Sequence, residues 1–212
     1  EDPDTSSRVV NFVLNDGTDD SATSAVTVTV AGDNDIPTLS DLNGDTVAYT
    51  ESDAALVLDD GTAATMEDLD ATDFNGGTLT VSFASGSTDS EDVLSVSDGG
   101  NFVINGTDLE HSSTDVGDLT GGSSGSDLVI TFDDDVTITS DTSTILNELL
   151  QAITYDNTND ENPDESDRTI QFTLTDGSDP VSGDVTLSLT PTNDASVLAG
   201  FGSTPVAYTE SD

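Results

Sequence analysis

The segment RTIQFTLTDGSDPVSGDVTLSLT, residues 168–190, is the clearest indication of fold in this chain. Apolar residues stand at every second position on both sides of the Asp176-Gly177 pair: Ile170, Phe172 and Leu174 before it, and Val185, Leu187 and Leu189 after it. Alternation with a period of two is typical of a strand with one buried face, and an Asp-Gly pair is typical of a hairpin turn. The segment therefore predicts an antiparallel hairpin.

The same alternation recurs along the chain, with Thr and Ser on the opposite faces, and turn residues such as Asn43-Gly44, Asp60-Gly61 and Asn105-Gly106 separate the runs. One buried and one solvated face per strand predicts an all-β protein, an antiparallel β-sandwich. Two segments depart from the pattern. A short helix is predicted at 142–152, where Ile145, Leu146, Leu149 and Leu150 share one face, and residues 112–126 are expected to form a long surface loop.

The hairpin segment belongs to a long internal repeat. Residues 1–19 align with 161–179 with ten identities, and VAYTESD occurs both at 47–53 and at 206–212. A fixed long period is typical of a tandem array. We therefore expect 1–35 to be the C-terminal end of one repeat, 36–193 a complete repeat and 194–212 the start of the next, all cut from a longer chain.

The repeat of 159 residues is larger than the roughly 100 residues of a seven-strand immunoglobulin-like domain. Either one sandwich carries extra strands and the helix, or two small sandwiches share the period. We expect the single enlarged sandwich, because the acidic junction sequences occur once per period.

Charge limits the partners. The 212 residues hold 44 acids against two basic residues, a formal net charge of −42. Binding to nucleic acid or to an anionic membrane surface requires a basic surface, so both are excluded. No apolar run reaches the roughly 18–20 residues that cross a bilayer. Cysteine is absent, and self-repulsion at this charge density opposes folding unless cations neutralise the acids. Divalent cations are the expected partners.

Calcium takes six to eight oxygen ligands, and three acidic clusters could supply them. The first is the linker Asp33, Asn34 and Asp35, with its counterpart Asn193 and Asp194. The second is the loop before the penultimate strand, with Glu1 and Asp2 in one copy and Glu161 and Asp164 in the next. The third is Glu51 with Asp68 and Asp70, repeated as Glu210. We expect all three clusters to meet at each joint between repeats. The alternative for any one cluster is a solvated acidic surface that binds no specific ion.

Several of these segments resemble bacterial cadherin-like repeats of giant, calcium-dependent, type I secreted (RTX-type) adhesins. The resemblance is carried by GDNDIP at 32–37, VAYTESD, EDLDATD at 67–73 and LLQAITYDNTNDENPDESDRTIQFTLTDGS at 149–178. It covers the whole period. One departure is the second junction, Asn193-Asp194-Ala195-Ser196, which lacks the proline of Ile36-Pro37.

The resemblance implies an immunoglobulin- or cadherin-like sandwich that extends a surface adhesin, with calcium at the linker and neighbouring repeats as partners. By analogy the ligands are Asp33, Asn34, Asp35, Glu51, Asp68 and Asp70. It also implies a secreted protein at the bacterial cell surface, acting in adhesion or biofilm formation at a distance from the cell. Lateral self-association of chains is left open.

A ligand-binding module and an enzyme are the two alternative functions. A module that binds glycan, ice or another cell directly would use the Thr-rich strand faces, but the aromatic content is only 5%. An enzyme is not expected. Paired carboxylates suffice for glycosidases, yet this chain has too many acids for that to be informative, and it lacks Cys, Lys and a second His. His111 is expected to be a surface residue in a polar loop.

Overall fold

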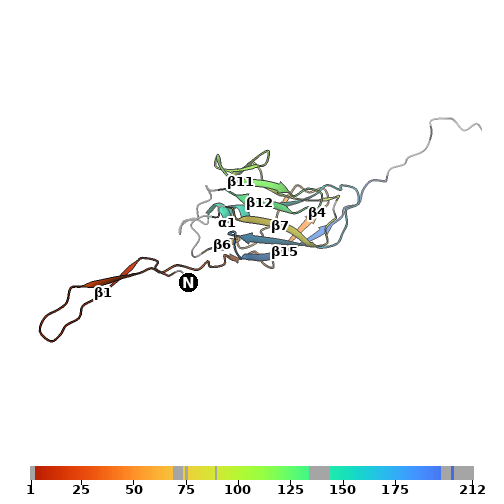
Figure 1. Cartoon of the computed structure of the whole chain (residues 1–212). Coiled ribbons are helices and arrows are strands. Elements are labelled where there is room, and N and C mark those ends of the chain that lie inside the picture. The colour runs from red at the N-terminus through yellow and green to blue at the C-terminus, as the bar shows by residue number, and fades with distance from the viewer. Residues whose placement is uncertain are drawn as a thin grey trace, which may run out of the picture.

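A computed structural model describes residues 3–68, 74, 76–88, 90–133, 144–196 and 202 (Figure 1). The strands are β1 (Arg8–Phe12), β2 (Ser24–Val28), β3 (Thr38–Ser40), β4 (Thr46–Thr50), β5 (Leu56–Val57), β6 (Thr65–Glu67), β7 (Thr78–Ser85), β8 (Asp92–Val96), β9 (Phe102–Asn105), β10 (Asp108–His111), β11 (Thr114–Gly121), β12 (Leu128–Phe132), β13 (Ile153–Asn157), β14 (Arg168–Thr175) and β15 (Pro180–Thr190). The helix is α1 (Thr144–Leu150). The described chain is thus nearly all β, as predicted.

The strands from β3 to β15 form two facing layers, and β1 and β2 form a separate hairpin. Within the described residues, the larger layer is an eight-stranded sheet in the order β4-β15-β14-β7-β12-β11-β10-β9. The opposite layer holds β5-β13-β8 and the pair β3-β6. Tyr49 of β4 and Tyr155 of β13 meet edge to face across the interior, with ring centroids 5.2 Å apart, and Phe83 of β7 contacts the same Tyr155 ring. The predicted β-sandwich is confirmed.

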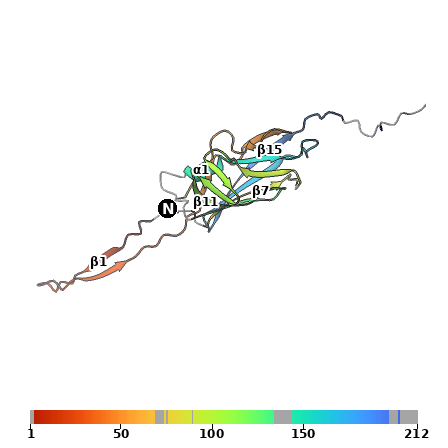
Figure 2. The ribbon, with the colours of Figure 1, turned by 90° about the horizontal axis from the view of Figure 1, so that it is seen from above.

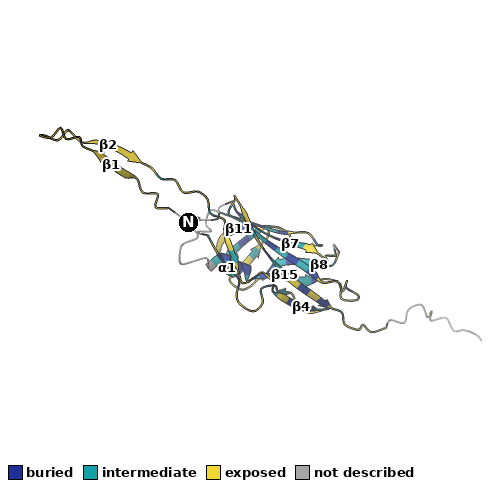
Figure 3. Ribbon diagram, turned by 90° about the horizontal axis from the view of Figure 1, so that it is seen from below, coloured by how far each residue is buried: buried dark blue, intermediate teal, exposed yellow. Residues whose placement is uncertain are grey.

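One continuous apolar core lies between the layers. It includes buried residues of β4, β6, β7, β8, β12, β13, β14 and β15, together with Leu146, Leu149 and Leu150 of α1. Burial alternates along β14, where Ile170, Phe172 and Leu174 are buried. Figure 3 shows the buried positions within the sandwich and the β1–β2 hairpin exposed. Since full burial of such a side chain stabilises a fold by about 1.5–3 kcal/mol, this strand is a major source of stability. A single core is the expected arrangement for one enlarged sandwich.

The predicted hairpin at 168–190 is formed by β14 and β15, which pair from Arg168↔Leu187 to Thr175↔Pro180. The repeat copy, β1–β2, pairs in the equivalent register, with Arg8 opposite Val28. Its apolar residues are exposed: Phe12 has 58% of its surface accessible, whereas the equivalent Phe172 has 0%. The sequence repeat is therefore matched by a repeat of strand pairing, while the burial of the two copies differs.

The opening of the sandwich is divided between the layers. β3 pairs antiparallel with β6, and after a turn that includes Asp41 (φ 61°) and Gly44 (φ 98°) the chain changes layer. β4 then pairs parallel with β15, from Thr46↔Thr186 to Thr50↔Thr190. Because the pairing is parallel, the end of β4 lies beside the end of β15.

The helix prediction at 142–152 is confirmed by α1. The loop expected at 112–126 is wrong, because residues 114–121 form β11 between β10 and β12. The apolar alternation of this strand is interrupted at position 117 by a glycine, where a Cβ atom would collide with the carbonyl oxygen of Thr131 on β12. Close backbone approach therefore replaced the apolar pattern that identifies a strand in sequence.

The chain enters and leaves the sandwich at opposite ends. Figures 1 and 2 show residues 29–37 joining the β1–β2 hairpin to one end, and residues 191–196 departing from the other. We call these the linker end and the exit end. Any joint between tandem copies would place the exit end of one sandwich beside the linker end of the next.

Candidate metal sites at the two ends of the sandwich

Glu51 is placed at the exit end by the parallel pairing of β4 and β15. Its backbone N–H donates to the Thr190 carbonyl at 2.9 Å, which extends the ladder by one residue. The side chain is 3% exposed. Its Oε2 accepts from the backbone N–H of Thr192 at 2.6 Å and from the Thr192 hydroxyl at 3.2 Å. This carboxylate therefore holds the chain as it leaves the last strand.

The other Glu51 oxygen, Oε1, is buried and has no hydrogen-bond partner among the residues that the structure describes. An ionised carboxylate removed from water is costly unless it is paired or coordinates a metal. The two arginines of the chain pair with other acids, Arg8 with Asp4 and Arg168 with Asp92. The oxygen is a candidate ligand for a bound cation.

The acidic loop 158–167, between β13 and β14, lies beside the end of β4. The Ser52 hydroxyl donates to Oδ1 of Asp160 at 3.3 Å, and the Tyr49 hydroxyl donates to Oδ1 of Asp156 at 2.8 Å. Burial, together with the Asp156 carboxylate, raises the pKa of Tyr49 to about 12. Negative charge from two segments, 50–53 and 156–160, is thus concentrated at the exit end.

The predicted ligands of the second cluster lie on this loop. Glu161 is exposed and its backbone N–H donates to the Asn159 side chain. Asp164 is also exposed, and its Oδ1 accepts from the Ser166 backbone N–H at 2.8 Å. Hydrogen bonding to Ser166, through its side chain first and its backbone second, lowers the pKa of Asp164. At the departing chain, the Asn193 side chain donates to the Asp194 carbonyl at 3.1 Å and the Asp194 side chain is exposed. Both clusters share the exit end with Glu51.

The linker cluster lies at the opposite end. The Asn34 side chain donates to Oδ2 of Asp176, in the β14–β15 turn, at 2.9 Å. Asp33 is exposed and Asp35 is half-buried. Asp68 is half-buried directly after β6, whose Glu67 pairs with Thr38 at the end of the linker. Asp33, Asn34, Asp35 and Asp68 therefore lie at the linker end, together with Asp176, which sequence reasoning did not assign.

This placement corrects one expectation. Glu51 and Asp68 were expected to form one cluster opening the same joint, but they lie at opposite ends of the sandwich. The reason is the change of layer between β3 and β4, which lets β4 run parallel to β15 toward the exit end. In a tandem array Glu51 would belong to the joint after its own repeat. Glu1, Asp2, Asp70 and Glu210 lie outside the described residues.

A second feature of the exit end was not anticipated from sequence. Arg168 and Asp92 form an ion pair with both side chains 0% exposed, and the nearest guanidinium and carboxylate atoms are 3.2 Å apart. The only sequence signal was the equivalent position of Arg8 and Arg168 in the repeat. No sequence pattern pointed to Asp92.

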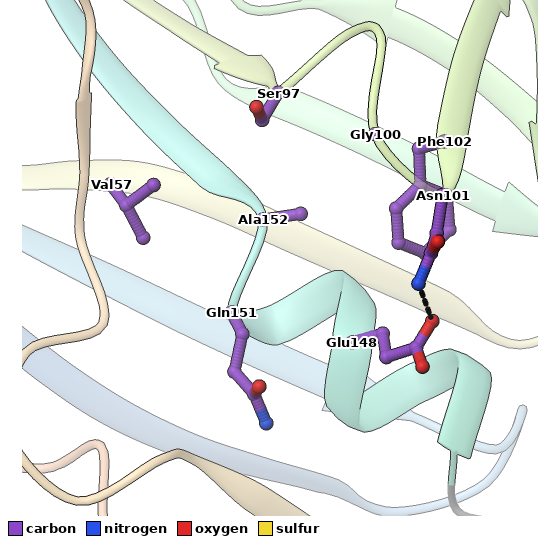
Figure 4. A pocket seen from close by; sticks show the side chains of 8 residues that line it. All are labelled: Val57, Ser97, Gly100, Asn101, Phe102, Glu148, Gln151 and Ala152. Carbon is purple, nitrogen blue, oxygen red and sulfur yellow. Dashed lines mark hydrogen bonds between the residues drawn. The ribbon is translucent and has the colours of Figure 1, made fainter.

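His111 does not lie in a polar loop, so that expectation is wrong. It ends β10, where its ring lies 5.0 Å from the ring of Phe102 and its Nε2 lies 2.7 Å from Oε2 of Glu148 on α1. The Asn101 side chain donates to the same Glu148 oxygen at 2.9 Å (Figure 4). The hydrogen bond with His111 is the main cause that lowers the Glu148 pKa. A shallow cavity of about 210 Å³ lies beside Glu148.

The described side chains alone do not complete a metal site: in that part of the chain, no three His, Asp or Glu residues are gathered closely enough to hold an ion. Comparison with protein-family models and with curated proteins finds no match for this chain. Nor does the described part contain a helix that is long and apolar enough to pass through a membrane.

Proposed function

We propose that this protein is a calcium-stiffened extender: tandem β-sandwiches whose joints are neutralised by bound calcium, in a large adhesin or fibre at a bacterial cell surface. The single observation that carries the proposal is the buried Oε1 of Glu51, which has no hydrogen-bond partner in the described chain, at the end where the chain departs toward the next copy. The repeat and the resemblance to cadherin-like adhesin repeats give this oxygen its context.

The residues present fit calcium better than a softer metal. Carboxylate and amide oxygens dominate both ends, cysteine is absent and the one histidine is engaged by Glu148. Calcium prefers six to eight oxygen ligands and accepts backbone carbonyls and water among them. At the exit end Glu51 would be the buried ligand, with Asp160, Glu161 and Asp194 as exposed ones.

In an array, further ligands would come from the linker end of the following repeat; on a single sandwich, water would take those places around the ion. Asp33, Asn34, Asp35 and Asp68 represent that surface here, because they lie at the linker end of this sandwich. Without an ion the carboxylates of two sandwiches repel each other across the joint. With an ion bound, the same groups become mutual ligands and the joint has one favoured geometry. The chemistry that calcium supplies is therefore charge neutralisation and fixed orientation.

Small-angle scattering of two copies of residues 36–193 joined in tandem, in calcium and in chelator, tests the proposal. Calcium should narrow the distribution of overall lengths and raise the maximum dimension, while magnesium at the same ionic strength should do so less, since magnesium demands a stricter octahedral geometry. Extracellular calcium modules bind with dissociation constants near 10⁻⁴–10⁻³ M, so millimolar calcium suffices. Identical scattering in calcium and chelator would refute a stiffening role.

A further inference from the structure

We propose that Arg168 is a positioning residue that holds the acidic loop 158–167 in the shape that accepts a cation, an inference that rests on the calcium function proposed above. Its guanidinium is fully buried at the first residue of β14. Nη1 donates to the backbone carbonyls of Asp164 and Ser166, and Nε and Nη2 donate to the Asp92 carboxylate over 3.2–3.4 Å. One side chain thus joins the loop backbone to the core.

Asp92 anchors this connection, because both of its carboxylate oxygens accept hydrogen bonds. Besides Arg168, it accepts from the Tyr155 hydroxyl at 2.5 Å, from the Asn157 side chain at 3.1 Å and from the Thr88 backbone N–H at 2.6 Å. Tyr155 is a core residue with 0% exposure. Asp92 therefore links the loop, through Arg168, to the core residue Tyr155.

Glu91 holds the other part of the same loop. Its Oε1 accepts from the Asn159 side chain at 2.7 Å, and its Oε2 accepts from the Asp164 backbone N–H at 3.1 Å. The Thr158 backbone N–H donates to the Glu91 carbonyl at 2.9 Å. Adjacent residues at the start of β8 therefore fix the loop at both ends of its acidic segment before any ion is present.

The repeat supplies an independent observation. Arg8, at the position equivalent to Arg168, donates to the carbonyls of Asp4 and Ser6 at 2.9 Å each. These are the equivalents of the Asp164 and Ser166 contacts, and they form even though the Arg8 side chain is 49% exposed. The contact between arginine and the two carbonyls is thus local to the loop, and Asp92 adds its attachment to the core.

The direction in which an Arg168 substitution changes calcium affinity shows whether Arg168 positions the loop or only contributes a positive charge. A guanidinium cannot be a calcium ligand, so its effect on calcium binding is indirect. If Arg168 acts only as a nearby positive charge, Arg168→Met should tighten calcium binding. If Arg168 positions the loop, calcium affinity should fall by about 10–100-fold, the usual loss when a residue that orients metal ligands is removed.

The experiment is calcium titration of the 212-residue chain, followed by NMR at the Thr192 and Asp160 amides, for wild type, Arg168→Met and Arg168→Met/Asp92→Asn. The double variant keeps the net charge and leaves no buried carboxylate without its cation, so it tests positioning alone. Asp118→Asn, an exposed acid on β11, is the matched control for losing one carboxylate. Both Arg168 variants should bind more weakly, and the control should bind as wild type.

Unchanged or tighter binding in the double variant would overturn the inference, whereas a wild-type chain that binds no calcium would overturn the proposed function itself. Hydrogen exchange on metal-free wild type gives a reading that needs no variant. The Asp164 and Thr158 amides, which donate to Glu91, should be protected without calcium. Exchange of both at the rate of an unfolded peptide would show that the loop is not preformed.

Discussion

The Glu51→Gln variant should be at least as stable as wild type without calcium, and less stable than wild type with calcium. In metal-free protein the carboxylate is 3% exposed and Oε1 lacks a hydrogen-bond partner in the described chain. Leaving a buried polar group unpaired costs about 1–3 kcal/mol. Glutamine keeps one acceptor oxygen for Thr192 and carries no charge, so the metal-free variant should be as stable as wild type or more stable by about 1–2 kcal/mol.

Calcium should change that order. At a hundredfold excess over the dissociation constant, one bound ion stabilises the folded state by about 2.7 kcal/mol. A tenfold to hundredfold loss of affinity on removing one charged ligand withholds about 1.3–2.3 kcal/mol of that gain. For a domain of this size 1 kcal/mol shifts Tm by about 2–4 °C, so wild type should rise by roughly 5–11 °C in calcium and Glu51→Gln by much less.

Scanning calorimetry of the chain in calcium, in magnesium and in chelator measures both halves of this prediction. Glu110→Gln on β10 is the matched control, since it makes the same chemical change six strands away from β4 in the larger sheet. Its Tm should respond to calcium as wild type does. The reasoning is refuted if Glu51→Gln lowers Tm equally with and without calcium, because the carboxylate would then act only through its bonds to Thr192.

Three further outcomes are expected. Phe172→Ala should destabilise the fold by about 3–5 kcal/mol in denaturant titration, because the side chain is fully buried in an interior strand of the larger sheet, and a loss below 1 kcal/mol would contradict that placement. Glu148→Gln should make stability depend less on pH in acid. The pKa of Glu148 is lowered in the folded state, so its carboxylate stabilises the fold above the unfolded pKa near 4.5, and this stability is lost as pH falls through the folded pKa. The urea midpoints of wild type and variant, measured from pH 6 to pH 3, should therefore converge as pH falls. Asn34→Ala should leave the free energy of unfolding within about 0.5 kcal/mol of wild type, as changes at exposed sites usually do. It should nevertheless broaden the distance distribution between spin labels on the β1–β2 hairpin and the sandwich, because the bond to Asp176 is lost. An unchanged distribution would show that this bond does not orient the linker.

The local features of the fold could be predicted because they depend on neighbours in sequence. Alternation around Asp176-Gly177 identified the β14–β15 hairpin, and the apolar face at 145–150 identified α1. The same reasoning failed at β11, because Gly117 fits a close backbone approach to Thr131 and leaves no apolar alternation. The composition of the acidic ends was visible as well, since Asp and Asn concentrate in the loops.

What the sequence by itself determined is the class of structure and the chemistry available: repeated strands with one apolar face, and loops whose oxygen atoms suit a hard cation. What only the tertiary structure decided is which of those loops meet. Glu51 was assigned to the wrong end because parallel pairing of β4 with β15 depends on residues about 140 positions apart, and the Arg168–Asp92 pair likewise joins residues 76 positions apart. Local patterns report which face of a strand is buried, whereas the partner of that strand is selected by packing of the whole core.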